Sequence, residues 1–380
     1  MSSSGDLTIL LTLKDRTEFT VRWMNYANSI GLPFKVLIAD GGFDETISAI
    51  LSDKKRFPDV NYEYVRYPYD KTYADYYSKI ANALGRVQTP FVAMADNDDF
   101  FIVDTLTEAV EFLSVNPDYA SCGGQPAQLW IRPSPLNKPE DLVYSKNVNW
   151  KCARIRSITA GTARERLRSQ AVSSADPIYY DVKRIEDVRK QSEIVRDLNL
   201  NDLFLTEFLT QFLTTITGKT KRLEKLYIAR QHNAPGSSAE AHQKQFGDWF
   251  GLMLVESWSE DFTKFVNCVS SILAATDGIS IPEAKDCVVT SYRMNVAPEL
   301  LSNILEEPSV TMSMPVVVRA VRRLVMLPEE NIFRKLARKL YRTIPWIALD
   351  SVYGIKIVAM LPRSSRKELK PILEFLARPR

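Results

Sequence analysis

The first 120 residues alternate between two hydrophobic patterns. Short continuous apolar runs, such as LTILLTL at 7–13, are typical of buried strands, whereas the stretches between them carry apolar residues at helical spacing. Strands alternating with helices predict βαβ units and a parallel sheet. The predicted strands are 7–13, 34–42, 61–68 and 90–101, and the predicted helices are 17–31, 45–56, 72–87 and 104–116.

The pattern loosens after residue 126. Residues 157–191 mix a short basic helix, a polar loop and the strand-like IYYDVKR, and 198–219 is a strongly amphipathic helix. A last strand then opens into the loop QHNAPGSS. Beyond residue 246 strand patterns disappear and helical spacing dominates, interrupted by prolines. We therefore predict an α/β catalytic domain at 1–245 and a mainly helical, basic region at 246–380.

Composition narrows the class of protein. The chain has 380 residues, of which 45% are hydrophobic and 25% charged, which is ordinary for a globular protein. The N-terminus shows no signal-peptide pattern, and no apolar run approaches the ~20 residues of a membrane span. Four scattered cysteines predict free thiols in a reducing cytoplasm, and two histidines exclude a multi-histidine metal site.

Charge is distributed unevenly. The net charge is +3, but residues 316–380 carry a net +10, so the rest of the chain carries −7. The segment NIFRKLARKLYR at 331–342 has apolar residues on one helical face and cations around the other. This pattern predicts contact with the cytoplasmic face of an anionic membrane. The alternative is a helical subdomain that packs its apolar faces internally, and nothing in the tail indicates nucleic-acid binding.

The candidate chemistry lies where predicted strands end. The apolar run PFVAMA leads directly into Asp96, Asn97, Asp98 and Asp99, and the second strand ends at Asp40. In parallel sheets, ligands collect at the carboxyl ends of the strands. Carboxylates there suit a hard divalent cation that in turn holds a diphosphate, and Mn²⁺ and Mg²⁺ both fit. The alternative is that these residues start a surface loop and cap the helix near residue 104.

These motifs, in this order, resemble the family 2 glycosyltransferases of the GT-A fold. The resemblance covers residues 5–240 and rests on LTILLTLKDR, KVLIADGG, PFVAMADNDDFF, NDLFLTEFL and ARQHN. It implies a Rossmann-like, mostly parallel sheet flanked by helices, and an inverting transferase that uses a nucleotide sugar. It assigns the nucleobase to Asp40, the base and ribose pocket to Thr12 and Lys14, the ribose to Asp96, and the metal to Asp98, with Asp99 supporting or sharing that role.

The resemblance also suggests a catalytic base. Inversion by single displacement needs a proton acceptor on the acceptor hydroxyl. The family places an acidic residue at the head of a helix about a hundred residues after the metal motif, and Asp202 fits that position better than Glu207. The family often has Glu-Asp there, whereas this chain has Asn201-Asp202. The alternative is that Asp202 only caps its helix.

Further residues follow from the same resemblance. His232 matches a histidine that some relatives use as a metal ligand, and Arg230 is an alternative phosphate contact. Tyr179 and Tyr180 are candidates for stacking on an acceptor sugar, or are packing residues of a strand. Relatives commonly carry an Arg-Asn pair before the metal strand, but here the nearest cation is Lys79.

The sequence thus predicts a cytoplasmic, Mn²⁺- or Mg²⁺-assisted glycosyltransferase. It would move a sugar from a nucleoside-diphosphate donor, with a UDP-sugar favoured, to a hydroxyl of a glycan or lipid-linked acceptor. One alternative is a nucleotidyltransferase that makes nucleotide sugars, although LTLKDRTEF lacks the glycine-rich loop of that class. Another is a non-catalytic glycan-binding module on a transferase fold.

Overall fold

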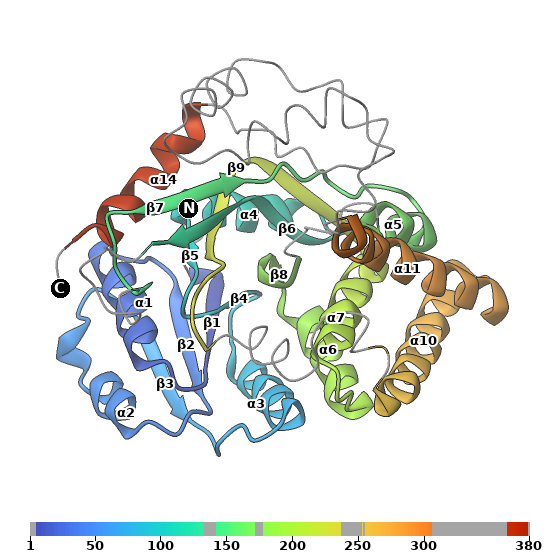
Figure 1. Ribbon diagram of the computed structural model, residues 1–380, viewed down its shortest axis with the longest axis horizontal. Helices are drawn as coiled ribbons and strands as arrows, with labels where there is room; N and C mark the ends of the chain where they lie inside the picture. Colours follow the sequence, from blue (N-terminus) through green and yellow to red (C-terminus); the bar gives the residue numbers. More distant parts are fainter. Residues whose placement is uncertain are drawn as a thin grey trace.

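The computed structural model describes residues 5–132, 142–171, 178–236, 253, 255–305 and 363–378. Figure 1 shows a twisted sheet through the molecule, with helices on both of its faces. This is the α/β architecture that the alternating pattern predicts.

The N-terminal elements follow the predicted order of strands and helices. The strand predicted at 90–101 is divided by a turn into β4 and β5, and a 3₁₀ turn, η2, follows α2. The elements are β1 (Leu7–Leu13), α1 (Thr17–Ser29), β2 (Lys35–Asp40), α2 (Glu45–Ser52), η2 (Lys54–Arg56), β3 (Tyr62–Arg66), α3 (Tyr73–Arg86), β4 (Phe91–Ala95), β5 (Phe100–Phe101) and α4 (Val103–Val115).

The later elements include three that the sequence patterns did not reveal: the long strand β6, the short strand β7 and the charged helix α6. The 3₁₀ turn η4 precedes β8, so IYYDVKR is only partly a strand. The elements are β6 (Tyr119–Ile131), β7 (Val148–Cys152), α5 (Ala163–Ala171), η4 (Ile178–Tyr180), β8 (Val182–Arg184), α6 (Ile185–Leu198), α7 (Leu203–Thr217), β9 (Lys219–Gln231), α10 (Glu256–Asp277), α11 (Ile281–Leu305) and α14 (Arg363–Leu376).

Within the described residues, nine strands form one mixed sheet. Its order is β3-β2-β1-β4-β8-β6-β9-β5, with β7 paired to β6. The pairs among β1 to β4 are parallel, as is the β6–β9 pair, whereas β8, β5 and β7 pair antiparallel. All seven residues of β1 are buried, as expected of a strand covered on both faces.

The register brings the predicted site residues to one edge. Leu13 of β1 pairs with Asp40, and Leu11 pairs with Ala95, the last residue of β4. Asp40 is the last residue of β2, and the 96–99 turn directly follows β4. Both strands flank β1, so these residues lie near its carboxyl end. This shared edge is the one that the sequence predicts.

Two hydrophobic cores cover the two faces of the sheet. Leu10 of β1 faces one core with α3, α5, α6, α7, α10 and α11, whereas Ile9 and Leu11 face the other with α1, α2 and α4. The helices near the C-terminus are thus part of the main core. Carboxylates of α10 also cap other helices, because Asp261 accepts from the Asn201 and Asp202 N–H groups and Asp277 from those at the start of α5.

The last helix, α14, packs back onto the sheet. Leu369, Ile372, Phe375 and Leu376 are buried in a third cluster with Tyr26 and Phe100, and Glu368 accepts from the Leu226 N–H. This part of the basic tail follows the internal-packing alternative, whereas 331–342 lies outside the described residues. None of the described helices is long and apolar enough to span a membrane alone. Helix α10 together with residues 281–297 has the length and composition of a span, but the two segments are bent by 120° relative to each other.

Candidate active site

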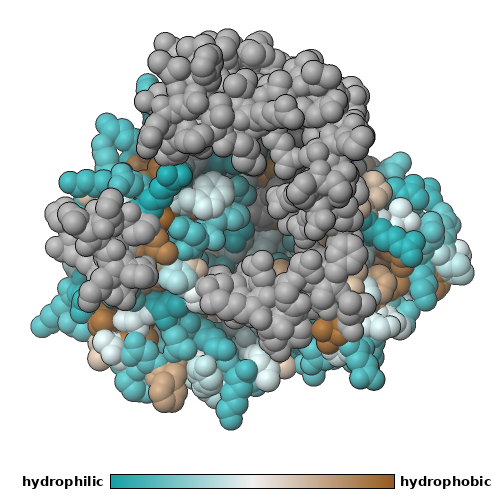
Figure 2. All heavy atoms as spheres, in the orientation of Figure 1, coloured by the Kyte–Doolittle hydropathy of each residue, from teal (hydrophilic) through white to brown (hydrophobic). Residues whose placement is uncertain are grey.

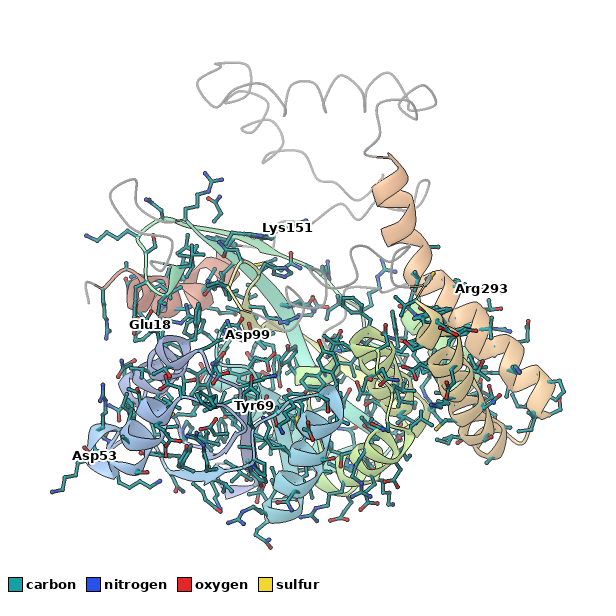
Figure 3. All side chains as sticks on the ribbon, turned by 60° about the horizontal axis from the view of Figure 1, so that its bottom comes forward. Glu18, Asp53, Tyr69, Asp99, Lys151 and Arg293 are labelled. Carbon is teal, nitrogen blue, oxygen red and sulfur yellow. The ribbon has the colours of Figure 1, made fainter. Side chains whose placement is uncertain are left out.

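The acidic turn between β4 and β5 gathers three carboxylates. Oxygen atoms of Asp96, Asp98 and Asp99 all lie within 4.8 Å of one another. Asp98 and Asp99 are buried, and Asp96 is partly exposed. In Figure 3, Asp99 lies well inside the outline of the molecule, whereas Asp53 lies at its edge. Among the described residues this is the only cluster of metal-ligating side chains so close together.

Helix α1 anchors the acidic turn from one side. The fully buried Arg22 donates to the Asp98 backbone carbonyl at 3.0 Å and to the Gln231 side chain at 2.6 Å. Asn97 donates to the Thr20 hydroxyl at 3.0 Å. Burial lowers the pKa of Arg22 to about 10, so the guanidinium remains charged at neutral pH. Sequence reasoning missed Arg22, although a cation one helical turn from Phe19 on an apolar face was an available signal.

Two partly exposed arginines form ion pairs with carboxylates of the turn. An Arg16 Nη atom lies 2.9 Å from Asp98 Oδ2, and Arg230 Nε lies 3.0 Å from Asp99 Oδ2. Arg230 also donates to the Tyr180 hydroxyl at 2.8 Å, and that hydroxyl donates to Asp96 at 2.6 Å. Each carboxylate therefore has its own donor: Arg16, Tyr180 or Arg230.

The surroundings shift the acidity of the turn. Burial raises the pKa of Asp96, and the nearby Asp98 adds to this rise. Burial also raises the pKa of Asp99, while the Arg230 guanidinium opposes the shift. The raised pKa values show that ionising these carboxylates together is costly, and a cation bound beside them would lower that cost.

Tyr180 and Tyr179 make contacts within the protein, and their stacking on an acceptor sugar remains a prediction. Tyr180 is buried, and its hydroxyl is engaged by Asp96 and Arg230. Tyr179 is half-buried and packs edge-on against Tyr180 with ring centroids 5.1 Å apart. The geometry matches the packing alternative, and it gives Tyr180 a role in orienting Asp96.

Asp40 is fully buried at the end of β2. Its oxygens accept from the Gly42 N–H at 2.8 Å and the Tyr64 hydroxyl at 2.7 Å, and Arg66 lies 3.5 Å away. These contacts fix the turn at Gly41 and Gly42, as expected of an aspartate that forms a turn. A nucleobase contact for Asp40 remains a prediction from the resemblance.

The other predicted nucleotide residues lie at the end of β1. Thr12 is buried, and its hydroxyl is 3.1 Å from that of Tyr76. Lys14 is exposed and lies over the Tyr69 ring, 5.0 Å from its centroid. Beside Lys14 is an open cavity of about 650 Å³ lined by Asp15, Phe43, Asp44, Glu45 and Tyr69. Figure 2 shows a hollow near the centre of the face in this view, with hydrophilic side chains along its left side and in its depth.

Lys79 is sealed in the interior. It forms an ion pair with Asp70 and donates to the Leu13 carbonyl at 2.8 Å. Both charged side chains are almost completely buried. Lys79 therefore supports the end of β1 from within and does not present its charge to the surface.

Two carboxylates on α7 are candidates for a base. Asp202 is the predicted one, and it caps the helix by accepting from the Leu205 N–H at 2.6 Å. Burial raises its pKa to about 6. Glu207 has an exposed side chain, but nearby protein atoms displace part of its water, and this raises its pKa to about 7. The Arg230 cation opposes this rise, and the Asp96 carboxylate adds to it. Glu207 thus belongs to the electrostatic environment of the acidic turn, which the sequence did not indicate.

His232 directly follows the last residue of β9. Its ring stacks on Trp130 with centroids 5.2 Å apart, and it is not among the close cluster of carboxylates. Partial burial, and then the Arg230 cation, lower its pKa. Its metal-binding role therefore remains a prediction.

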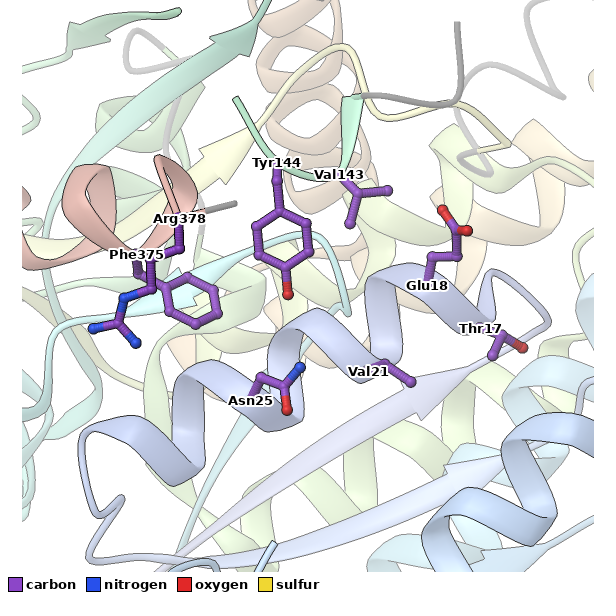
Figure 4. A pocket seen from close by; sticks show the side chains of 8 residues that line it. All are labelled: Thr17, Glu18, Val21, Asn25, Val143, Tyr144, Phe375 and Arg378. Carbon is purple, nitrogen blue, oxygen red and sulfur yellow. The ribbon is translucent and has the colours of Figure 1, made fainter. Parts of the chain in front are cut away.

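A separate cavity of about 570 Å³ lies between α1 and α14 (Figure 4). The lining contains no residue of the acidic turn. It consists of Thr17, Glu18, Val21, Asn25, Val143, Tyr144, Phe375 and Arg378.

Comparison with known proteins gives structural likenesses only. No family model matches the sequence, and no curated protein matches it either. A structure of residues 1–349 of TarS from S. aureus in complex with UDP-GlcNAc has a TM-score of 0.45 and 12% identity, covering 77% of this chain and 73% of that one. The mannosyltransferase PcManGT from Pyrobaculum calidifontis, in complex with GDP-Man and Mn²⁺, has a TM-score of 0.41 and 12% identity, covering 88% and 83%. The chain is thus similar to structures of glycosyltransferases, the class that its sequence motifs resemble, and its own site residues carry the functional proposal.

Proposed function

We propose that the chain is a metal-assisted, inverting glycosyltransferase. It moves a sugar from a nucleoside-diphosphate sugar to a hydroxyl of a glycan or lipid-linked acceptor. The observation that carries this proposal is the cluster of Asp96, Asp98 and Asp99 at the carboxyl end of a central parallel strand. The sequence resemblance adds the expectation of a UDP-sugar.

The acidic turn fits a hard divalent cation. Its donors are all carboxylate oxygens, which Mn²⁺ and Mg²⁺ prefer. Asp98 is the principal ligand that we propose, with Asp96 beside it, while Asp99 is held by Arg230 and by the Gln231 N–H at 3.2 Å. A cation held there would neutralise a diphosphate and stabilise it as a leaving group.

The nucleoside end of the donor fits the open cavity beside Lys14. Tyr69 and Phe43 supply exposed aromatic rings, and Lys14 supplies a cation next to them. The cavity includes Asp15, which is joined in sequence to Arg16, and Arg16 reaches Asp98. A diphosphate extending from this cavity to the acidic turn would therefore pass Arg16.

A base on α7 completes the proposed reaction. Asp202 remains our first candidate, because the resemblance assigns the base to this position. Glu207 is the second candidate, because it is solvent-accessible and lies in the field of Asp96 and Arg230. Either carboxylate would accept the proton of the attacking hydroxyl as the bond to the sugar forms.

The proposal is tested by calorimetry and turnover. UDP and GDP are titrated into the wild-type chain with and without Mn²⁺, and UDP-sugars are then assayed for hydrolysis and transfer. We expect micromolar-range or tighter diphosphate binding that depends on Mn²⁺. Consumption of a sugar 1-phosphate with a nucleoside triphosphate would instead indicate a nucleotidyltransferase. Donor binding without turnover, with a range of acceptors, would indicate a glycan-binding module.

We further propose that the basic tail holds the enzyme at the cytoplasmic face of an anionic membrane. Its support is the net +10 of residues 316–380 and the amphipathic pattern at 331–342. The test is co-sedimentation with neutral and anionic vesicles at low and high salt, since electrostatic attraction weakens as salt rises. Replacing Arg334, Lys335, Arg338 and Lys339 by Gln should abolish binding to anionic vesicles. Equal binding to neutral and anionic vesicles would contradict this localisation.

A further inference from the structure

The turn after β1 brings Arg16 to the acidic site in an unusual backbone conformation. Asp15 and Arg16 have φ values of 57° and 59°, in the left-handed region that non-glycine residues rarely adopt. Such residues cost free energy and cluster at functional sites. The Asp15 carboxylate holds the turn by accepting from the Phe43 N–H at 2.6 Å. The fold therefore maintains a strained turn whose result is the placement of the Arg16 side chain.

The Arg16 guanidinium reaches the acidic turn from a backbone position next to a residue that lines the proposed nucleoside cavity. It donates to Asp98 Oδ2 at 2.9 Å, and its chain neighbour Asp15 lines the cavity beside Lys14. Its Nε is buried and has no hydrogen-bond partner among the described residues. The side chain is 17% exposed and its planar group stacks on Phe19 at 4.5 Å. Arg16 thus has donor capacity that Asp98 alone does not use.

We propose that Arg16 is an exchangeable cation of this site. When the donor is absent, Arg16 pairs with Asp98 and neutralises it. When a divalent cation binds Asp98, Arg16 leaves this carboxylate and donates its hydrogen bonds to the donor's diphosphate. The inference rests on the proposed function. Its physical basis is that one carboxylate oxygen serves the guanidinium or the metal ion, and that guanidinium matches phosphate oxygens in geometry and charge.

Arg230 differs from Arg16 in this respect. It is shared between Asp99 and the Tyr180 hydroxyl, so it helps to fix Asp96 and Asp99 together. Arg16 has Asp98 as its only side-chain ion pair among the described residues. Displacing Arg16 would therefore leave the network around Arg230 intact.

The test uses Arg16→Asn, because asparagine tolerates the left-handed backbone but is too short to carry a cation to Asp98. MnCl₂ alone is titrated into wild type and variant by calorimetry, and then UDP and GDP are titrated with saturating Mn²⁺. We expect roughly tenfold tighter Mn²⁺ binding without nucleotide, because the competing cation is gone. We also expect roughly tenfold weaker binding of UDP or GDP with Mn²⁺ present, while uridine or guanosine binding is unchanged.

Two controls separate this role from general charge effects. Arg86→Ala removes an exposed cation that pairs with Glu63 far from the turn, and it should leave both affinities unchanged. Arg16→Lys keeps the charge without the planar fork, and it should restore part of the diphosphate affinity. Unchanged Mn²⁺ affinity in Arg16→Asn, when wild type binds Mn²⁺, would overturn the inference alone. Failure of wild type to bind Mn²⁺ and both diphosphates would overturn the proposed function and the inference with it.

Discussion

Arginine–aspartate ion pairs occur in two different environments in this molecule. At the acidic turn, Arg16 and Arg230 are 17% and 36% exposed, although their partners Asp98 and Asp99 are largely buried. Elsewhere, Asp181 pairs with Arg222, and both side chains are 1% exposed. The first kind can be reached and rearranged by a ligand, whereas the second is sealed.

The backbone around each pair explains the difference. Gly123 of β6 lies so close to Asp181 and Arg222 that a Cβ there would overlap both side chains. Gly41 covers Asp70, the partner of Lys79, in the same way. The acidic turn instead joins β4 to β5, and the cations that pair with its carboxylates are partly exposed. The presence of an ion pair is therefore weak evidence for a site until the exposure of its cation is known.

The largest effect that we expect is a loss of activity when the accessible ion pair at the acidic turn is broken. Asp98→Ala should reduce transfer by roughly three orders of magnitude or more, because a bound metal ion supplies several kcal/mol to such reactions. Mn²⁺-dependent nucleotide binding should also disappear. Calorimetry and turnover assays measure both effects.

The melting temperature is the control for Asp98→Ala, because the Arg16 cation left behind can reach solvent. It should stay close to the wild-type value. Full Mn²⁺-dependent binding by the variant would remove Asp98 from the metal site. A large loss of stability would mean that the Arg16–Asp98 pair is structural after all.

The next effect concerns the sealed pair. Asp181→Ala leaves Arg222 buried without its carboxylate, and the free energy of unfolding should fall by roughly 3–5 kcal/mol. Urea denaturation measures this loss. The double variant Asp181→Leu with Arg222→Met should recover much of it, since apolar groups of similar volume need no charge partner. A single variant as stable as wild type would break the comparison.

Two substitutions on α7 then identify the base. Asp202→Asn keeps a helix-capping oxygen but removes the proton acceptor, so turnover should fall by a factor on the order of 10² with donor binding nearly unchanged. Glu207→Gln is the matched variant one turn further along the helix. If Asp202→Asn remains active and Glu207→Gln is inactive, the base is Glu207.

The smallest effect is a shift along the pH axis, and it distinguishes the same two residues in the wild type. A base works only when deprotonated, so below its pKa the rate at low substrate falls about tenfold per pH unit, and above it the rate levels off. Because partial loss of water around both carboxylates raises their pKa values, the midpoint should lie near 6 for Asp202 and near 7 for Glu207. A rate that is flat between pH 5 and 8 would argue against either carboxylate as the base.

Much of the N-terminal fold could be predicted from the sequence. The apolar run 7–13 is β1, and the acidic residues 96–99 follow directly where β4 ends. Strand β6 and helix α6 were missed for local reasons. β6 contains Gly123, Gly124 and Pro126, which weaken a strand pattern, and α6 is so rich in charge that its apolar stripe is narrow.

Within the candidate site, the sequence indicated the carboxylates but not their partners. Arg230 and Asp99 are separated by 131 positions, and Arg22 and Gln231 by 209. For Tyr180 the sequence allowed contact with an acceptor sugar or packing in a strand, and neither role indicated that its hydroxyl donates to Asp96. Nothing in the local pattern distinguishes these partners from other polar residues.

The sequence by itself determined the order of strands and helices, and with it the edge of the sheet at which acidic residues collect. Hydrophobic periodicity depends on near neighbours in the chain, so it can be read without knowing the fold. Only the tertiary structure decided which charges are sealed, as for Asp40 and Lys79, and which remain accessible, as for Arg16 and Glu207. The physical reason is that desolvation and charge pairing depend on all surrounding atoms, most of which come from distant parts of the chain.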